Sequence, residues 1–330
     1  MTGHIGRRDF ITLLGGAAVA WPFAARAQQA GPPVIGYLGA GSPAGSASLL
    51  AIFRQGLADV GYVEGRNVAI EYRFAEGRYD RLPLLAEELV RRQVAVIFAS
   101  PSPAALAAKA ATATIPIVFT AAEDPVKLGL VANLARPGGN ATGPVFLFAE
   151  LGSKQLGLLR ELVPTAARIG LLMNPTNANA SDVTKDMTAA GTAMGVQFEV
   201  VQASNILEID AAFASLVRNR AEGLLFGTDS FFYSRRLQLA TLATRNAIPS
   251  IFNACEYPEA GGLMSYGTSL SEAFRQVGIY TGRVLKGEKP VDLPVVQSSK
   301  FEFVINLSTA RALGMEIPPM LLARADEVIE

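Results

Sequence analysis

The sequence predicts an α/β protein with two doubly wound lobes, each built on a parallel sheet that helices cover on both faces. Short apolar runs alternate with stretches whose apolar residues recur at helical spacing. This alternation runs through the chain twice, and a Pro- and Gly-rich stretch at 136–140 separates the two rounds. Strands that are apolar throughout are typical of parallel sheets buried on both faces, so each round predicts one lobe.

The first round predicts a lobe over residues 28–143. Its first strand runs into the breaker GAGSP at 39–43, and its second strand alternates apolar and polar residues. Leucines and a phenylalanine at helical spacing, closed by Gly61, predict the helix between these two strands. The predicted strands are 34–38, 67–74, 94–99 and 115–119, and the predicted helices are 49–60, 82–90 and 104–111.

The second round predicts a lobe over residues 144–267, and a less regular tail follows it. The predicted helices are 151–162, 181–194, 206–218 and 234–245, and the predicted strands are 168–173, 196–201, 224–226 and 249–252. The tail predicts a strand at 263–266, a helix at 271–286 and a strand at 301–305. We expect the tail to complete both lobes across a hinge, with about 268–290 in the first lobe and about 291–330 in the second.

The N-terminus predicts an export signal over residues 1–27. Its apolar stretch at 10–23 is shorter than the roughly 20 residues that a membrane-spanning helix needs. Arg7 and Arg8 precede the apolar stretch, and a small-x-small cleavage sequence ends at Ala27, as in signal peptides of the twin-arginine type. An ordinary Sec signal stays the alternative. Cleavage near Ala27 predicts a periplasmic protein, and without a cysteine near the cut no lipid anchor is expected.

Removing this signal changes the chemistry available to the mature chain. The only histidine, His4, and the only tryptophan, Trp21, leave with it. A Ser-His-Asp mechanism and a histidine metal site are therefore excluded, and Cys255 has no partner for an internal disulfide. Taking three arginines and one aspartate away from 29 basic and 29 acidic residues leaves a net charge of about −2, which does not favour nucleic acid.

Polar loops follow nearly every predicted strand, and they are where a ligand is expected. In open parallel sheets, ligands bind beyond the carboxyl ends of strands and at helix starts. Ser100 and Ser102 add hydroxyl donors to a helix start that suits a carboxylate, and Asp229 could take an ammonium group. The same serine and aspartate residues beside prolines are also ordinary helix caps. The candidate ligand-binding residues are Ser42, Ser100, Ser102, Thr120, Asp124, Asn174, Asp229, Phe231 and Glu256.

A dinucleotide site is a weaker interpretation of the first loop. Gly39-x-Gly41 after a first strand has the outline of the glycine-rich fingerprint. Pro43 removes an amide that would face a pyrophosphate, and the second strand ends in Tyr72-Arg73-Phe74 without an acid for a ribose. No cofactor, no metal ion and no catalytic residue are therefore expected.

Four stretches carry a resemblance to a known family. They are EGRNVAIEYRFAEG, LAEELVRRQVAVIFASPSPAALAAK, IPIVFTAAEDPVKLGLVANLARPGGNATG and FEFVINLSTARALG. Together they resemble the ABC-transporter substrate-binding proteins of the tryptophan-binding-like group, which have the type I periplasmic binding fold. The resemblance covers about residues 34–314. It implies two α/β lobes joined by three crossings, with a solute between them and no enzymatic activity.

The resemblance also implies roles for several residues. Relatives that bind aromatic amino acids would match a carboxylate contact at Ser100 and Ser102, with Thr120 and Asp124 near the cleft. Asn174 and Asp229 match polar positions on the second lobe. The loop around Ser42 and the aromatic run that starts at Phe231 differ from the family pattern, and Phe231, Phe232 or Tyr233 could stack on a ring of the solute.

These observations favour a periplasmic solute-binding component of an ABC uptake system. It would be a monomer that closes on a small polar, amino-acid-like solute and presents it to ABC permease membrane subunits, and aromatic amino acids are among the expected solutes. The alternative hypothesis is a twin-arginine-exported, cofactor-dependent oxidoreductase. A sensory module that docks to a receptor would differ from the first hypothesis only in its partner.

Overall fold

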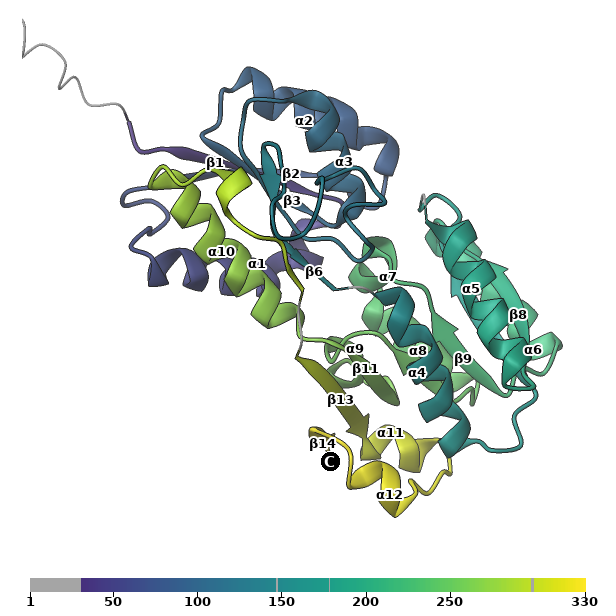
Figure 1. Ribbon diagram of the computed structural model, residues 1–330. Helices are drawn as coiled ribbons and strands as arrows, with labels where there is room; N and C mark the ends of the chain where they lie inside the picture. Colours follow the sequence, from purple (N-terminus) through teal and green to yellow (C-terminus); the bar gives the residue numbers. More distant parts are fainter. Residues whose placement is uncertain (1–30, 147, 178, 298–299) are drawn as a thin grey trace, which may run out of the picture.

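The computed structural model describes residues 31–146, 148–177, 179–297 and 300–330. The predicted signal peptide at 1–27 lies outside these ranges. The described chain forms two α/β lobes, with the first at the top and the second at the bottom of Figure 1. None of the helices within the described ranges has the length and hydrophobicity of a transmembrane segment.

The first lobe is a five-stranded parallel sheet with helices on both faces. The strand order is β2-β1-β3-β4-β5, and every neighbouring pair is parallel. The strands are β1 (Val34–Gly39), β2 (Ala69–Phe74), β3 (Val96–Ser100), β4 (Ile117–Phe119) and β5 (Ala141–Thr142), and the helices are α1 (Pro43–Asp59), α2 (Leu82–Arg91), α3 (Ser102–Ala111) and α10 (Leu270–Leu285), with a 3-10 turn η2 (Tyr79–Arg81).

Two apolar cores sandwich this sheet, because successive residues of a strand point to opposite faces. In β3, Ile97 and Ala99 join the core under α2 and α3, whereas Val96 and Phe98 join the core under α1 and α10. The continuous apolar run in the sequence is thus a strand covered on both sides, as predicted from its composition.

The second lobe is a seven-stranded mixed sheet of order β14-β13-β11-β10-β9-β7-β8. Its strands are β7 (Arg168–Met173), β8 (Gln197–Gln202), β9 (Gly223–Phe226), β10 (Ser250–Phe252), β11 (Met264–Thr268), β13 (Phe301–Asn306) and β14 (Glu327–Ile329). Its helices are α4 (Phe148–Leu162), α5 (Ala180–Ala193), α6 (Ile206–Arg218), α7 (Ser230–Ser234), α8 (Arg236–Arg245), α9 (Glu256–Glu259), α11 (Leu307–Ala312) and α12 (Pro319–Leu322).

Two features of the second lobe differ from the sequence prediction. Strand β13 runs antiparallel to β11, because the chain leaves β11 for the first lobe as α10 and re-enters the second lobe from the same side (Figure 1). The helix predicted at 234–245 is α8, and a short helix that was not predicted, α7, precedes it and is separated from it only by Arg235. The start of α7 follows from Asp229, whose carboxylate caps the amides of Phe231 and Phe232.

The chain passes between the lobes after β6 (Pro144–Val145), between β11 and α10, and between β12 (Val296–Gln297) and β13. Strands β6 and β12 pair with each other in parallel, so two of these passages lie side by side. The chain still belongs to the first lobe after residue 290, where the sequence predicted the boundary. Leu293 and Val295 pack into the two cores of that lobe, and Thr142 Oγ1 donates a hydrogen bond to the Leu293 carbonyl at 2.6 Å.

Helices α1 and α10 pack in close backbone contact at Gly278. A substitution of Gly278 therefore tests this packing. A Cβ at Gly278 would lie 2.3 Å from the Phe53 carbonyl oxygen, and backbone at that contact has little room to move. Gly278→Ala is expected to lower the free energy of unfolding by about 1–3 kcal/mol through overpacking. Urea unfolding followed by circular dichroism measures this loss.

The matched control is Gly157→Ala, in the interior of α4. A Cβ there meets nothing within 4 Å, so alanine is expected to raise stability by about 0.5–1 kcal/mol through its better helix propensity. Equal stability of Gly278→Ala and the wild type would contradict the close packing of α1 on α10.

Candidate ligand-binding cleft

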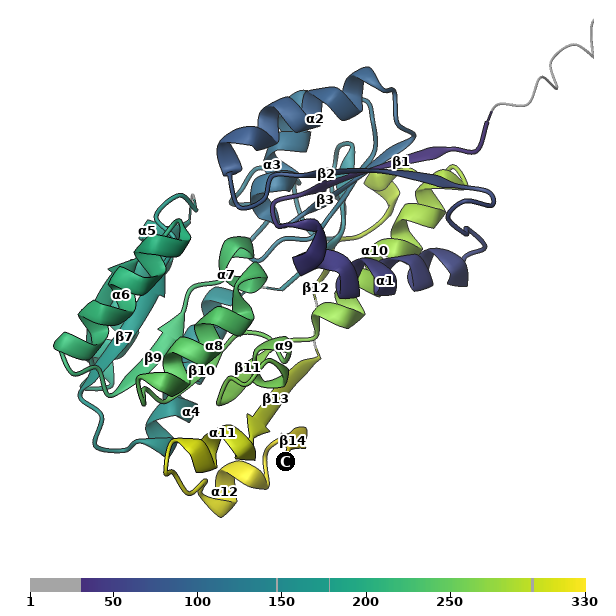
Figure 2. The ribbon, with the colours of Figure 1, turned by 180° about the vertical axis from the view of Figure 1, so that it is seen from behind.

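A cavity lies where the strand ends of the two lobes face each other. It encloses about 850 Å³, counted to its open mouth. The first lobe contributes the loops after β1, β3 and β4, and the second lobe contributes the loops after β9 and β10 and the start of α7. We call it cavity A. Helix α7 sits at the boundary between the lobes, next to the start of α1 (Figures 1 and 2).

The structure brings five of the nine predicted site residues into cavity A: Ser42, Ser100, Ser102, Thr120 and Asp229. A second cavity, cavity B, adjoins it inside the second lobe, encloses about 750 Å³ and includes Asn174 in its lining. The remaining three predicted residues, Asp124, Phe231 and Glu256, line neither cavity.

Hydroxyl groups gather at the start of α3, on one side of cavity A. Ser100 Oγ and Thr120 Oγ1 lie 2.7 Å apart and are buried. Ser102 Oγ accepts a hydrogen bond from the Ala122 amide at 3.1 Å and donates one to the Glu123 carboxylate. The positive end of the α3 dipole and these hydroxyls form a polar patch that suits a carboxylate or carbonyl oxygen.

Ser42 combines the two roles that the sequence left open. Its hydroxyl caps α1 by accepting a hydrogen bond from the Gly45 amide at 3.2 Å, and Pro43 takes the first helical position. Ser42 also lines cavity A. The helix start that has the outline of a dinucleotide loop is thus a capped helix end beside the cleft.

Aromatic and aliphatic side chains also line cavity A. Tyr37, Leu49, Tyr233 and Phe274 line it. The Tyr37 ring packs at 5.1 Å from Phe98, and burial raises the pKa of its phenol to about 12, so it stays neutral. The sequence did not predict Tyr37, Leu49 and Phe274 as site residues, because an apolar residue within a strand or a helix predicts only a core position. Tyr233 belongs to the aromatic run that was predicted to offer a ring for stacking.

Asp229 is the most heavily hydrogen-bonded acid of the cleft. Its Oδ2 accepts from Tyr79 Oη at 2.6 Å and from Asn177 Nδ2 at 3.2 Å. Its Oδ1 accepts from Asn174 Nδ2 at 3.0 Å and from the Phe231 amide at 2.9 Å. Burial raises the pKa of Asp229, and these donors oppose the rise. Both oxygens are committed to protein donors, so a ligand ammonium would have to displace one of them.

Glu123 is the acid that offers an oxygen to both cavities. It is half-buried, and it lines cavity A and cavity B. Its Oε2 bonds to Ser102, whereas its Oε1 accepts no hydrogen bond from any residue that the structure describes. The sequence did not predict this role for Glu123, because two acids followed by Pro125 are typical of a turn or a helix cap.

The three predicted residues outside the cavities have structural contacts instead. Asp124 Oδ1 accepts the Val126 amide at 2.8 Å and so stabilises its own turn. Phe231 is buried in the second lobe's core beside Phe232, with Gly77 of the first lobe against its ring. Glu256 begins α9, and burial raises the pKa of its carboxyl.

The charge of the lining restricts what the cleft can hold. Among the described residues that line the two cavities, none is Lys, Arg or His. Within the same described ranges, no group of three or more His, Cys, Asp and Glu residues is arranged to hold a metal ion. An anionic group of a ligand would therefore meet hydroxyls and a helix end, and a cationic group would meet carboxylate.

The comparisons with known proteins agree with this architecture. The family model described as ABC transporter substrate binding protein matches residues 47–329. A protein named tyrosine-binding protein, from Clostridioides difficile, is 32% identical over 266 residues, which is 80% of this chain and 76% of the relative.

Solved structures extend the likeness to the fold. A conserved domain protein from Vibrio cholerae superposes with a TM-score of 0.82 at 26% identity, over 90% of this chain and 99% of the other. A domain from Streptococcus pneumonia in complex with L-Trp gives a TM-score of 0.80 at 25% identity, over 90% and 100%. A ligand-free, open substrate binding protein from Clostridium difficile gives 0.64 at 26% identity, over 90% and 99%.

The family model covers most of the chain, and the Clostridioides difficile relative exceeds 30% identity over four fifths of it. The predicted fold and family are confirmed, and the comparisons give no support to the oxidoreductase hypothesis. The chain belongs to the ABC transporter substrate binding protein family and has the two-lobed fold of the type I periplasmic binding proteins.

Proposed function

We propose that this substrate-binding protein binds an amino-acid-like solute with an aromatic side chain, for uptake, and acts without catalysis. Cavity A carries the proposal, because it joins a hydroxyl-rich end from the first lobe with aromatic walls from both lobes. An α-carboxylate fits the polar end, and a ring fits among Tyr37, Tyr233 and Phe274. The names of the relatives, one tyrosine-binding and one in complex with L-Trp, support the same class of solute.

The ammonium group of such a solute has one favoured partner. Asp229 is saturated by Tyr79, the two asparagines and the Phe231 amide, whereas Glu123 keeps an oxygen for a donor from the solute. We therefore assign the ammonium to Glu123, the carboxylate to Ser100 and Thr120, and a closing role to Asp229.

A role in solute uptake also implies a cellular compartment and a membrane partner for this protein. Substrate-binding proteins of ABC systems deliver small solutes to membrane permease subunits. The proposed twin-arginine signal with cleavage near Ala27 would place the mature protein in the periplasm as a monomer, next to such a permease.

The two lobes have the arrangement expected for a closed state. Tyr79 of the first lobe and Asp229 of the second form a hydrogen bond of 2.6 Å. The superposition favours the L-Trp complex, with a TM-score of 0.80, over the ligand-free open structure, with 0.64, at nearly equal identity. A solute that contacts both lobes favours the closed state by its differential affinity.

Tyr79→Phe is expected to favour the open state. A hydrogen bond to a charged group contributes about 1.5–3 kcal/mol, and its loss weakens solute binding about tenfold or more. Without solute, small-angle X-ray scattering should give a larger radius of gyration for this variant than for the wild type.

Tyr72→Phe is the matched control, because the Tyr72 hydroxyl accepts from Arg54 and donates to Glu64 within the first lobe. It should leave the radius of gyration and the solute affinity unchanged. An unchanged radius and affinity for Tyr79→Phe would contradict the closing role of Asp229.

A thermal-shift screen of the mature protein against amino acids and small carboxylates tests the solute class. A solute at 100 times its Kd adds about 2.7 kcal/mol and moves the melting midpoint by several degrees. Aromatic amino acids are expected to give the largest shifts among the amino acids. A screen in which no amino acid shifts the midpoint would remove the proposal.

Ser100→Ala should then reduce the affinity of the strongest binder about tenfold, because it removes one of the two hydroxyls assigned to the carboxylate of the solute. Ser181→Ala, at an exposed position of α5 outside both cavities, is its control and should bind as the wild type does.

A further inference from the structure

A single amino acid bound in cavity A would leave cavity B unfilled. It lies between α4, α5 and the ends of β7 and β9, and it shares Ala122, Glu123, Asn177 and Thr228 with cavity A. The two cavities are therefore chambers of one site.

The floor of cavity B is apolar. Leu171, Met173, Met187, Leu225 and Phe226 line it, and each is nearly inaccessible to solvent. A Cβ at Gly152 would lie 2.2 Å from Met187 Sδ, so the Met187 side chain fits against α4 only because residue 152 is a glycine. Methionine walls adapt to apolar groups of different shape.

Most polar side chains around cavity B already bond within the protein. Gln155 Nε2 donates to the Tyr266 carbonyl at 2.7 Å. Asn174 bonds to Asp229 and to Thr176, and Thr228 Oγ1 accepts from Asn253 at 3.0 Å. These groups gain little from a polar ligand, and the apolar floor of the chamber favours an apolar one. Asp186, an exposed acid of α5, also lines cavity B.

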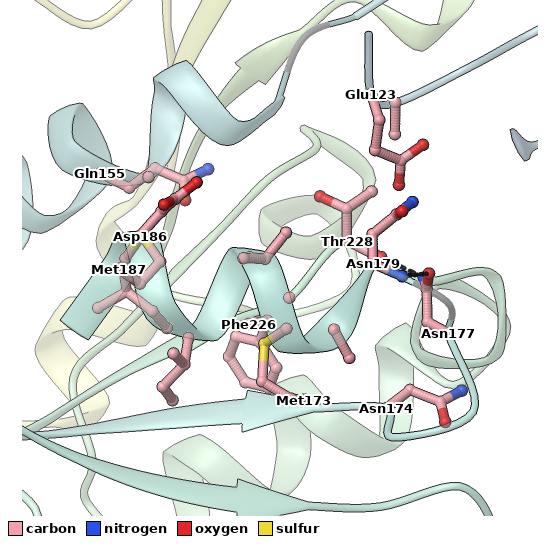
Figure 3. Close-up of a pocket in the computed structure, with 17 residues that line it drawn as sticks. Glu123, Gln155, Met173, Asn174, Asn177, Asn179, Asp186, Met187, Phe226 and Thr228 are labelled. Atoms are coloured by element: carbon pink, nitrogen blue, oxygen red, sulfur yellow. Dashed lines mark hydrogen bonds between the residues drawn. The ribbon is translucent and has the colours of Figure 1, made fainter. Parts of the chain in front are cut away.

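Glu123 stands between the two chambers. Figure 3 shows its side chain reaching from the first lobe toward Thr228 and Asn179 of the second. Its Oε1 has no partner among the described residues, and no described basic residue lines either chamber. A cationic nitrogen of a solute at this junction would pair with Glu123 Oε1. The two parts of the solute on either side of that nitrogen would then extend into cavity A and cavity B.

We propose that the solute spans both chambers and is a zwitterion of dipeptide size with an apolar N-terminal residue. Its ammonium bonds to Glu123, and its N-terminal side chain fills cavity B. Its C-terminal residue lies in cavity A, with the carboxylate at the hydroxyls of Ser100 and Thr120. This inference rests on the proposed function and extends the solute from one residue to two.

Isothermal titration of the mature protein with four probes tests the inference. The probes are L-tyrosine, glycyl-L-tyrosine, L-leucyl-L-tyrosine and N-acetyl-L-leucyl-L-tyrosine. The wild type is expected to bind leucyl-tyrosine at least about tenfold more tightly than glycyl-tyrosine, because only the former has a side chain for cavity B. N-acetylation removes the ammonium and is expected to weaken binding at least about tenfold.

Two variants assign these effects to the chambers. Val183→Trp, which fills cavity B from α5, should remove the preference for leucyl-tyrosine and leave the affinity for glycyl-tyrosine unchanged. Thr188→Trp, at an exposed position of the same helix outside both cavities, should keep the preference. In Glu123→Gln the penalty for N-acetylation should disappear.

The outcomes separate this inference from the proposed function. If tyrosine binds as tightly as leucyl-tyrosine, or if glycyl- and leucyl-tyrosine bind the wild type equally, cavity B is no subsite although the solute class stands. If no probe binds the wild type, both proposals fail. The wild-type comparison decides the matter even if Val183→Trp does not fold, which its melting curve without ligand would reveal.

Discussion

The carboxylate of Asp229 holds together the parts on which the cleft depends. It caps the amide end of α7, accepts from Asn174 and Asn177 on the neighbouring strand end, and accepts from Tyr79 of the other lobe. A buried carboxylate is costly unless donors surround it, and here the donors come from three separate segments. The position of α7, the shape of the loop after β7 and the contact between the lobes are consequently fixed by one group.

The two acids that line cavity A therefore have different roles. Asp229 satisfies its oxygens within the protein and serves closure, and Glu123 keeps one oxygen for a partner from outside. Because no described basic residue lines either chamber, an anionic group must be bound by hydroxyls and the α3 dipole. This favours solutes that bring their own positive charge, and it connects the electrostatics of the site with the amino-acid class of the named relatives.

Much of the fold could be predicted from local pattern. Strand β7 and helix α6 have the bounds that the sequence predicts, because a continuous apolar run and a regular helical spacing leave few alternatives. The short elements α7 and α9 were missed, because a helix of four or five residues has no periodicity to detect. The antiparallel β13 also escaped prediction, since strand direction depends on where the chain re-enters the lobe.

The site shows the same division. The sequence by itself determined the polar strand ends, and five of the nine candidate residues line cavity A because parallel strands bring their carboxyl ends to one edge. Only the tertiary structure decided that Tyr37, Phe274 and Glu123 face the same space, and that Phe231 packs into a core instead. These residues are far apart in the chain, and their meeting depends on how two lobes close, which no local pattern encodes.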